Sequence, residues 1–311
     1  MVCPLVFLGA GLLDEALGDP EGWPHPVRAF GWAIARLDGA RRGIAAPAAL
    51  RLWGVLLALG LPALVAAFAW GLLRLCGPWG WIAELLLGAW MLAGRSLRDA
   101  VRPVAAALEA RDLPAARGAV ARVVGRDTEG LDGSEVARAG LETLAESLCD
   151  GVVAPLFWFA ALGLPGLWAF KAVSTLDSMV GHREAPWTHF GWASARLDDA
   201  LNWVPARLTA LLVALAAGSG RALAFAWRDG GKTESPNAGV VEAAFAGALG
   251  VQLGGTNGYD GVAKEGPRLG DPGRAPSAAV LREGLNLAAR VNRLALPAGA
   301  LTLLALRGLH G

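Results

Sequence analysis

The sequence predicts an all-α, polytopic integral membrane protein. We expect a helical bundle with one broken or re-entrant helical segment and with cytoplasmic polar loops and helices, formed by residues 1–311 as a single domain. Hydrophobic residues make up 54% of the 311 residues and charged residues only 18%, whereas a soluble domain usually carries about a quarter charged residues. The mean hydropathy is +0.43. Residues 52–73 contain no charge, and at about 1.5 Å per residue such a run crosses a hydrocarbon core of roughly 30 Å.

Charge and cysteine content exclude several classes of protein. The 28 basic and 27 acidic residues give a net charge of +1, so no overall field draws the chain to nucleic acid. The high apolar content excludes a disordered chain. Cys3, Cys76 and Cys149 lie far apart and outside any metal-binding spacing, which indicates neither a disulfide framework nor a structural zinc site. We expect them to be small buried residues.

The first two predicted spans form a helical hairpin. Residues 52–73 lie between Arg51 and Arg74, and a charge-free turn leads to a second apolar stretch at 79–94. Tryptophans in both stretches fit the aromatic belts of a membrane interface. Glu84 lies inside the second stretch. It is either a functional intramembrane carboxylate or a residue at the level of the lipid headgroups.

Arginines orient this hairpin in the membrane. Several arginines precede it and several follow it, and none lies in its turn, so the positive-inside rule places both flanks in the cytoplasm. Weaker apolar segments follow at 151–170, 208–227 and 294–306, and the last spans only if flanking arginines snorkel outward. The N-terminal run 2–13 is too short to span and lacks the features of a signal peptide.

The polar residues gather in four blocks, at 13–31, 125–155, 171–207 and 228–271. In the second block, Asp132 and Glu135 predict a capping box that starts a helix. Glu142, Glu146 and Asp150 then follow at intervals of four residues and share one face of that helix. Such a face is either a magnesium site, because Mg²⁺ prefers oxygen ligands, or an acidic face paired with arginines.

The other blocks contain further candidate groups. Prolines fix the turns of the first block, whose polar residues are Asp14, Asp19, His25 and Arg28. His25 is either a structural histidine, the more common role, or part of a loop that contacts an anion. The third block contributes Lys171, Asp177, Asp198 and Asn202. In the fourth, residues 231–233 resemble the end of a Walker A loop, but Ala226 stands where the first glycine is required, so we reject a P-loop. The glycine-rich residues 253–259 either present backbone N–H groups to a phosphate or form a turn.

Six segments carry a resemblance to a known family. They are GDPEGWPHPVR, GRDTEGLDGSEVARAGLETLAESLCDGVVAPLFW, KAVSTLDSMVGHR, HFGWASARLDDALNWVPARLTALL, SPNAGVVEAAFAGALGVQLGG and RLGD. Together, and in this order over nearly the whole chain, they resemble the CobD/CbiB family, the adenosylcobinamide-phosphate synthases of cobalamin biosynthesis. Small departures occur at Ser174, where asparagine is expected, at 239–241 and at 232–234, so no role is carried over to these side chains.

The resemblance implies an integral membrane acid-amine (amide-forming) ligase. Such an enzyme joins (R)-1-amino-2-propanol or its O-phosphate to the propionate carboxylate of adenosylcobyric acid, with ATP and Mg²⁺, and gives adenosylcobinamide or its phosphate. It is expected to be a multi-pass protein of the cell inner membrane with its active site facing the cytoplasm. Its expected partners are the corrinoid, the amine, the lipid bilayer and other membrane-bound enzymes of cobalamin assembly, and not nucleic acid.

Within that reaction the polar blocks suggest a role for each candidate residue. A carboxylate that an amine attacks needs activation, commonly as an acyl phosphate, and Mg²⁺ and arginines stabilise the phosphoryl charge. The hypothetical metal ligands are Glu142, Glu146, Asp150 and Asp198. The hypothetical catalytic groups are Asp14, Asp19 and His25, which would assist amine deprotonation, and Asp177, which would act near the nucleotide. The hypothetical substrate-binding residues are Arg28, Arg126, Lys171 and Arg183 for phosphate, and Asn202, Asn237 and Asn257 for corrinoid amides.

The segment 151–170 is expected to be broken. Gly163, Pro165 and Gly166 lie in its middle, and a full crossing would put the second and third blocks in opposite compartments although ATP and the corrinoid are cytoplasmic. We therefore expect two half-helices that return the chain to the cytoplasmic side, with the irregular backbone buried in protein.

Two other functions fit parts of the sequence. A membrane transporter for a corrinoid or another amphipathic ligand would also contain carboxylates and broken helices. A membrane sensor for such a ligand would lack a nucleotide requirement. Neither explains the full series of six segments.

Overall fold

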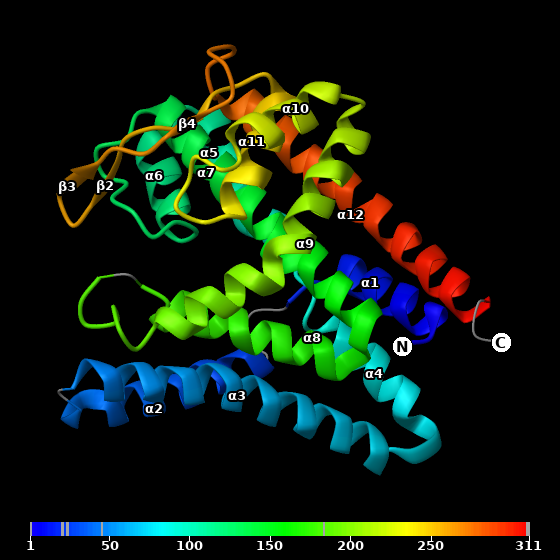
Figure 1. Ribbon diagram of the computed structural model, residues 1–311. Helices are drawn as coiled ribbons and strands as arrows, with labels where there is room; N and C mark the ends of the chain where they lie inside the picture. Colours follow the sequence, from blue (N-terminus) through cyan, green and yellow to red (C-terminus); the bar gives the residue numbers. More distant parts are fainter. Residues whose placement is uncertain (1, 20–21, 23–24, 45, 183, 309–311) are drawn as a thin grey trace. The chain divides into compact units, whose positions relative to one another are not determined.

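The computed structural model describes residues 2–308 apart from 20–21, 23–24, 45 and 183. Its secondary structure is mostly α-helical, with only four short strands in the described part of the chain, which confirms the predicted all-α class (Figure 1). The chain divides into two compact units. Unit 1 comprises residues 1–93, 154–202 and 296–311, and unit 2 comprises residues 94–153 and 203–295.

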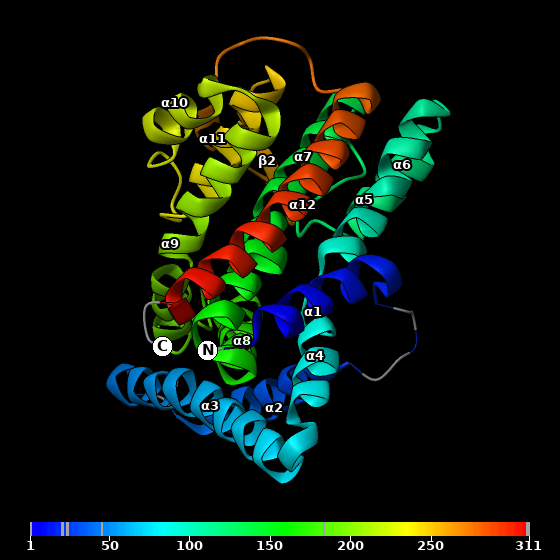
Figure 2. The same cartoon turned by 90° about the vertical axis from the view of Figure 1, so that its right-hand side faces the viewer.

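Unit 1 contains the N-terminal helices and a long broken helix. Prolines occupy the first turns of its first three helices, where the missing N–H costs nothing. Helix α1 packs against α4, and α2 and α3 pack against α8 (Figure 2). Its helices are α1 (Pro4–Leu17), α2 (Pro26–Ala40), α3 (Pro47–Leu75), α4 (Gly80–Ala89) and α8 (Ala154–Val180), with the first part of α9 (Trp192–Ala217) and the last part of α12 (Ala278–Gly308).

A small cluster of buried side chains holds α2, α3 and α8 together. It contains Ile34, Leu57, Leu176, Val180 and Phe190. Gly54 of α3 lies directly against the chain at Phe190, because a Cβ atom on Gly54 would stand only 2.0 Å from the Phe190 carbonyl oxygen. A side chain at position 54 would therefore push α3 away from this cluster.

Helix α8 is broken at Gly163, as the sequence predicts. Gly163 has φ 67° and ψ −160°, a conformation that glycine adopts without steric cost. The backbone N–H of Leu164 then donates a hydrogen bond of 3.2 Å to Glu84 Oε1 of α4. Glu84 thus satisfies one of the amide groups that the break leaves without a helical partner.

Unit 2 is a set of short helices around α7. The predicted capping box is present: the Asp132 carboxylate accepts from Glu135 N at 2.8 Å, and Asp132 N donates to the Glu135 carboxylate at 2.8 Å. Helices α5 and α6 pack against α7 on one side, and α11 packs against it and against α10. The elements are α5 (Gly94–Glu109), α6 (Leu113–Ala121), α7 (Gly133–Leu148), a π-helical turn (Cys149–Val153), α10 (Gly220–Asp229) and α11 (Ala238–Leu249), with the remaining parts of α9 and α12.

Two short antiparallel strand pairs complete unit 2. Strand β1 (Leu253–Gly254) pairs with β4 (Arg268–Leu269), and β2 (Asn257–Tyr259) pairs with β3 (Val262–Lys264). The glycine-rich residues 253–259 therefore form strands joined by turns. The Asp127 side chain accepts from Gly261 N at 2.8 Å, and Asp127 N donates to Gly258 O at 2.9 Å, which fastens the β2–β3 hairpin to the segment before α7.

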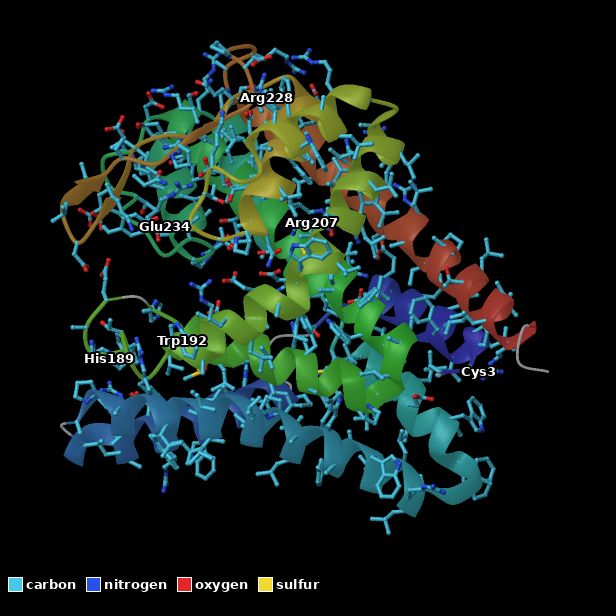
Figure 3. All side chains as sticks on the ribbon, in the orientation of Figure 1. Cys3, His189, Trp192, Arg207, Arg228 and Glu234 are labelled. Atoms are coloured by element: carbon cyan, nitrogen blue, oxygen red, sulfur yellow. The ribbon has the colours of Figure 1, made fainter. Side chains whose placement is uncertain are left out.

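In the described part of the chain, three helices are long and apolar enough to cross a membrane: Pro47–Leu75, Gly133–Val180 and Trp192–Ala217. Nitrogen and oxygen atoms are sparse on the side chains of α3 (Figure 3). The predicted segments 52–73 and 151–170 lie within the first two. The prediction for 208–227 differs, because the helix ends at Ala217 and Gly218 has φ 60°. Helix α4 covers less than the predicted stretch 79–94, and 294–306 is the end of α12.

Candidate functional site

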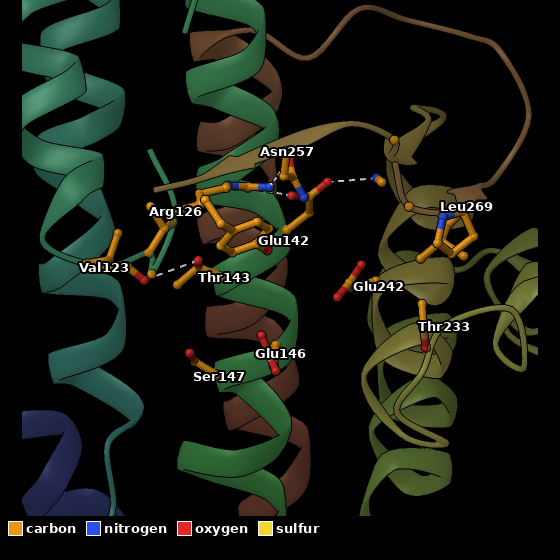
Figure 4. A pocket seen from close by; sticks show the side chains of 17 residues that line it. Val123, Arg126, Glu142, Thr143, Glu146, Ser147, Thr233, Glu242, Asn257 and Leu269 are labelled. Carbon is orange, nitrogen blue, oxygen red and sulfur yellow. Dashed lines mark hydrogen bonds and ion pairs between the residues drawn. The ribbon is translucent and has the colours of Figure 1, made fainter. Parts of the chain in front are cut away.

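Unit 2 contains a pocket of about 370 Å³ between α7, α11 and the strands (Figure 4). Its walls come from the second and fourth polar blocks of the sequence, which lie about a hundred residues apart along the chain. Four of the predicted site residues line it together: Arg126, Glu142, Glu146 and Asn257. Sequence-based prediction missed Thr233, Glu242 and Tyr259, which line the same pocket.

Glu142 is the centre of a buried ion-pair network. Only 8% of the residue is exposed. Arg126 Nη2 lies 2.5 Å from one carboxylate oxygen, and Arg138 Nη1 lies 3.1 Å from the other. Gly254 N donates to the same carboxylate at 2.7 Å. For Glu142 the structure therefore matches the second interpretation of the acidic face, a carboxylate paired with arginines.

The same arginines connect α7 to the strands. Arg126 donates to the Asn257 side-chain oxygen, and Arg138 donates to Gly254 O at 2.9 Å and to Thr256 O at 3.1 Å. Gly255 N donates to Pro267 O at 3.1 Å. The backbone N–H groups of Gly254 and Gly255 are thus used within the fold, which favours the turn over the phosphate-binding interpretation of this segment.

Glu146 and Glu242 line the pocket from opposite helices (Figure 4). Glu146 extends from α7 and is exposed, whereas Glu242 extends from the apolar helix α11. Burial raises the pKa of the Glu242 carboxyl well above its usual value, and the negative charges of Glu142 and Glu146 raise it further, although Arg126 and Arg138 act in the opposite direction. A cation between these carboxylates would relieve that repulsion. The only sequence signal for Glu242 is a single charge inside the apolar run 238–249.

The remaining predicted residues of unit 2, Asp150 and Asn237, lie next to the helices that line the pocket. Asp150 is part of the π-helical turn after α7. Asn237 precedes α11 and accepts a hydrogen bond of 2.8 Å from Arg207. The Lys232 ammonium lies 2.7 Å from the buried Asp229 carboxylate, so this lysine of the rejected Walker A segment stabilises the end of α10.

In unit 1, the predicted residues of the first polar block lie near the end of α1 and at the start of α2. His25 caps α2: its Nδ1 accepts from Val27 N at 3.2 Å, and its Nε2 lies 2.7 Å from Trp90 O. Because the carbonyl only accepts, this arrangement requires the neutral tautomer protonated at Nε2. Asp19 lies 3.8 Å from His25 Nε2. Asp14 is buried in α1, and Arg28 lies in the first turn of α2.

The third block places its predicted residues on α8 and α9. Lys171 and Asp177 belong to the second half of α8. Asp198 and Asn202 of α9 are hydrogen-bonded to each other at 3.0 Å, and Asn202 is buried. Arg183 lies outside the described residues. Both ring nitrogens of His25 and one carboxylate oxygen of Asp198 are therefore engaged within unit 1.

The predicted magnesium site requires several oxygen donors on one pocket. Over the described ranges, no three His, Cys, Asp or Glu residues are grouped closely enough to hold a metal ion. Glu146 and Glu242 nevertheless provide two carboxylates on one pocket, with Thr143 and Ser147 beside them. Such oxygen donors suit Mg²⁺, which usually keeps several waters and binds through one or two carboxylates plus substrate phosphates.

Comparison with known proteins identifies the family. Residues 7–288 match the family model described as CobD/Cbib protein. The chain is 49% identical over 279 residues to "Cobalamin biosynthesis protein CobD" of Geobacter metallireducens, covering 86% of each chain. It is 48% identical over 285 residues to the protein of the same name from Rhodobacter capsulatus, covering 88% of this chain and 89% of that one.

A more distant relative covers almost the full length. "Cobalamin biosynthesis protein CbiB" of Salmonella typhi is 41% identical over 312 residues, which is 97% of each chain. No solved structure matches the chain. The expected resemblance is confirmed by the family match and by these relatives. The chain belongs to the CobD/CbiB family of cobalamin biosynthesis proteins.

Proposed function

We propose that this chain is an ATP-dependent amide ligase that joins (R)-1-amino-2-propanol or its O-phosphate to adenosylcobyric acid. The observation that carries the proposal is the pocket of unit 2, in which the Arg126 guanidinium and the carboxylates of Glu146 and Glu242 line one cavity. Family membership supports a step in cobalamin biosynthesis. A ligase that handles a phosphorylated intermediate and a cationic amine needs both kinds of charge at one site.

The reaction requires activation of the corrinoid carboxylate. Transfer of the terminal phosphoryl group of ATP to a carboxylate oxygen gives an acyl phosphate and ADP. The amine nitrogen then attacks the acyl carbon, the bond from that carbon to the phosphate oxygen breaks, and phosphate leaves as the nitrogen loses a proton. Arg126, held in place by Glu142, would offset the phosphoryl charge from one wall of the pocket.

Mg²⁺, when bound, would neutralise nucleotide phosphate charge. Glu146 and Glu242 are the side chains of unit 2 that would hold it, and Asp150 of the same unit remains a predicted ligand; Asp198, also predicted as a ligand, belongs to unit 1. Glu142 would act through Arg126, which it positions. This assignment adds Glu242 to the predicted ligands because it lines the pocket opposite Glu146.

The other predicted roles remain part of the proposal. Arg28, Lys171 and Arg183 would bind phosphate, and Asp14, Asp19 or Asp177 would accept the amine proton. His25 suits this role less well, because both of its ring nitrogens are already engaged. Asn237 and Asn257 would bind corrinoid amides; each accepts a hydrogen bond from an arginine through its side-chain oxygen, while Asn202 is bonded to Asp198.

An activity assay tests the reaction directly. The purified protein is incubated with adenosylcobyric acid, ATP, Mg²⁺ and each amine in turn, and the amide product is measured by mass spectrometry. We expect product only with ATP present. At saturating Mg²⁺, Glu146→Gln and Asp150→Asn should each slow amide formation by at least about tenfold, whereas Glu234→Gln, an exposed carboxylate change, should not. Uptake of corrinoid by vesicles without any amide formation would contradict the ligase and support a transporter.

We also propose a multi-pass arrangement in the cell inner membrane with the site facing the cytoplasm. The break at Gly163 supports it, because a break there divides α8 into two half-helices, which a return of the chain to the cytoplasmic side requires. The test is a single cysteine at Thr175→Cys, probed with a membrane-impermeant thiol reagent. Labelling from the periplasmic side alone would contradict this orientation.

A further inference from the structure

Helix α10 (Gly220–Asp229) has two different outward flanks. Its inner face is buried and packs on α11 (Figure 2). Leu223 and Trp227, four residues apart, share one flank and are 41% and 94% exposed. Arg221 and Arg228, seven residues apart, share the other flank, and both guanidinium groups lie over the ring of Phe225.

This helix is held rigidly in unit 2. The Asp229 carboxylate at its end binds Arg228 at 2.7 Å and Lys232 at 2.7 Å and accepts from Gly270 N at 2.8 Å. Arg228 also binds Asp271 at 2.8 Å. The exposed Trp227 side chain therefore belongs to a helix whose position in unit 2 is fixed, and not to a flexible segment.

The chain enters α10 directly from a candidate membrane span. Helix α9 is apolar enough to cross a membrane and ends at Ala217. Its exposed leucines recur at helical spacing toward that end, at positions 208, 211 and 215. Gly218 then turns the chain with φ 60°, and α10 begins at Gly220. If α9 crosses the membrane, α10 begins where that span leaves the hydrocarbon core.

We propose that α10 is an interfacial helix that lies in the membrane surface, with Leu223 and Trp227 inserted among the lipid headgroups. Tryptophan favours this zone because its ring is apolar and its N–H is polar. Arginines on the flank of such a helix lie close to lipid phosphates, and Arg221 occupies that position. The exposed flank of α10 would therefore contact lipid at the boundary between the headgroups and the acyl chains. This placement does not depend on the proposed reaction.

Site-specific quenching in a bilayer tests the proposal. The full-length protein, with its three cysteines replaced by alanine, carries one cysteine at Trp227→Cys labelled with bimane and is reconstituted into nanodiscs of phosphatidylcholine and phosphatidylglycerol. A second variant carries the label at Leu223→Cys on the same flank. The control is Glu265→Cys, an exposed position between β3 and β4.

We expect lipids spin-labelled near the top of the acyl chain to quench the label at 227 and 223 several-fold more than at 265. Iodide in the buffer should quench in the opposite order. Equal iodide quenching at 227 and 265 would place α10 in water and overturn the proposal. Protection of 227 and 223 from both quenchers would overturn it as well, because a protein surface would then cover this flank.

Discussion

Two glutamates on the pocket of unit 2 have opposite electrostatic surroundings. Glu142 lies between Arg126 and Arg138. Glu242 lies on an apolar helix and faces the charges of Glu142 and Glu146, so its pKa is raised. At a pH above the usual pKa of a glutamate, Glu242 therefore keeps its proton in the folded protein, whereas in the unfolded chain it has released that proton. By linkage, the free energy of unfolding falls as the pH rises from that usual value through the raised one.

Replacing Glu242 should remove this loss of stability. We expect Glu242→Gln to match the wild type near about pH 5 and to become increasingly more stable than the wild type as the pH rises toward about 8, because only the wild type carries the carboxyl whose raised pKa costs stability at higher pH. The measurement is thermal unfolding of the detergent-solubilised protein, without Mg²⁺, across this pH range. Glu234→Gln, with a largely exposed side chain, is the control and should keep the wild-type profile. Parallel profiles for the wild type and Glu242→Gln would contradict the prediction.

The environment of the Asp229 carboxylate lowers its pKa, in contrast to that of Glu242. Hydrogen bonds from Arg228, followed by those from Lys232 and Gly270 N, lower its pKa below its usual value. The stability it provides is therefore present above that usual value and is lost as the pH falls through the lowered one. Its side chain is fully buried, so a neutral replacement leaves several donors poorly satisfied.

Asp229→Asn should cost about 2–3 kcal/mol of stability at neutral pH, since it removes a buried charge with several charged hydrogen bonds. The matched control is Asp271→Asn, which removes a half-exposed partner of the same Arg228 and should cost less than about 1 kcal/mol. Thermal unfolding of the two variants at neutral pH measures the difference. Equal losses would show that burial of Asp229 does not determine the strength of this network.

At the residue scale, local pattern predicted some partners and missed others. The capping box of Asp132 and Glu135 was predicted because both partners lie within four residues. Glu242 was missed because it is a lone charge in an apolar run, and the carboxylates that raise its pKa come from a segment about a hundred residues earlier. Sequence spacing within one helix carries no information on such distant neighbours.

At the scale of elements, the break in α8 depends on one glycine and one carboxylate from another helix. Gly163 has φ 67°, and a Cβ atom there would lie 2.8 Å from Glu84 Oε1. Gly163→Ala should therefore destabilise the protein by about 1–2 kcal/mol, because alanine is strained at this φ. Gly60→Ala in α3, where a Cβ atom meets nothing within 4 Å, is the control and should be neutral or stabilising.

Thermal unfolding in one detergent compares the two alanine variants. A smaller or equal loss at Gly163 would mean that α8 straightens without cost, and the half-helices would then not be set by this residue. Expression level offers a second measure, because a membrane protein with a disrupted helix pair is degraded before it accumulates.

Element boundaries were predicted less well than element types. The segment 208–227 is apolar enough on average to suggest one span, but Gly218 ends α9 and α10 follows as a separate helix. Alanine and leucine continue on both sides of the turn and keep the average hydropathy high, although Gly218, Ser219 and Gly220 are turn-forming residues and Arg221 is charged. The break at Gly163 was predicted because a proline follows the glycine closely.

At the scale of the whole molecule, composition predicted the class, and six sequence segments in a fixed order predicted the family. The site itself required three-dimensional packing. Gly254 N donates to Glu142, and Arg126 bonds to Asn257, so the second and fourth polar blocks meet in unit 2. A pocket formed from segments this far apart in the chain follows from tertiary contacts that no local motif specifies.

The fold as a whole should respond to the ligands that the pocket is proposed to hold. A ligand that binds only the folded state stabilises it by RT ln(1 + [L]/Kd), about 2.7 kcal/mol at a concentration of a hundred times Kd. We expect Mg²⁺ with ATP to raise the unfolding temperature of the wild type relative to EDTA. The double variant Glu146→Gln, Glu242→Gln should lose most of this shift, because two pocket carboxylates are gone, while Glu234→Gln should keep it. A full shift in the double variant would place the metal elsewhere in the chain.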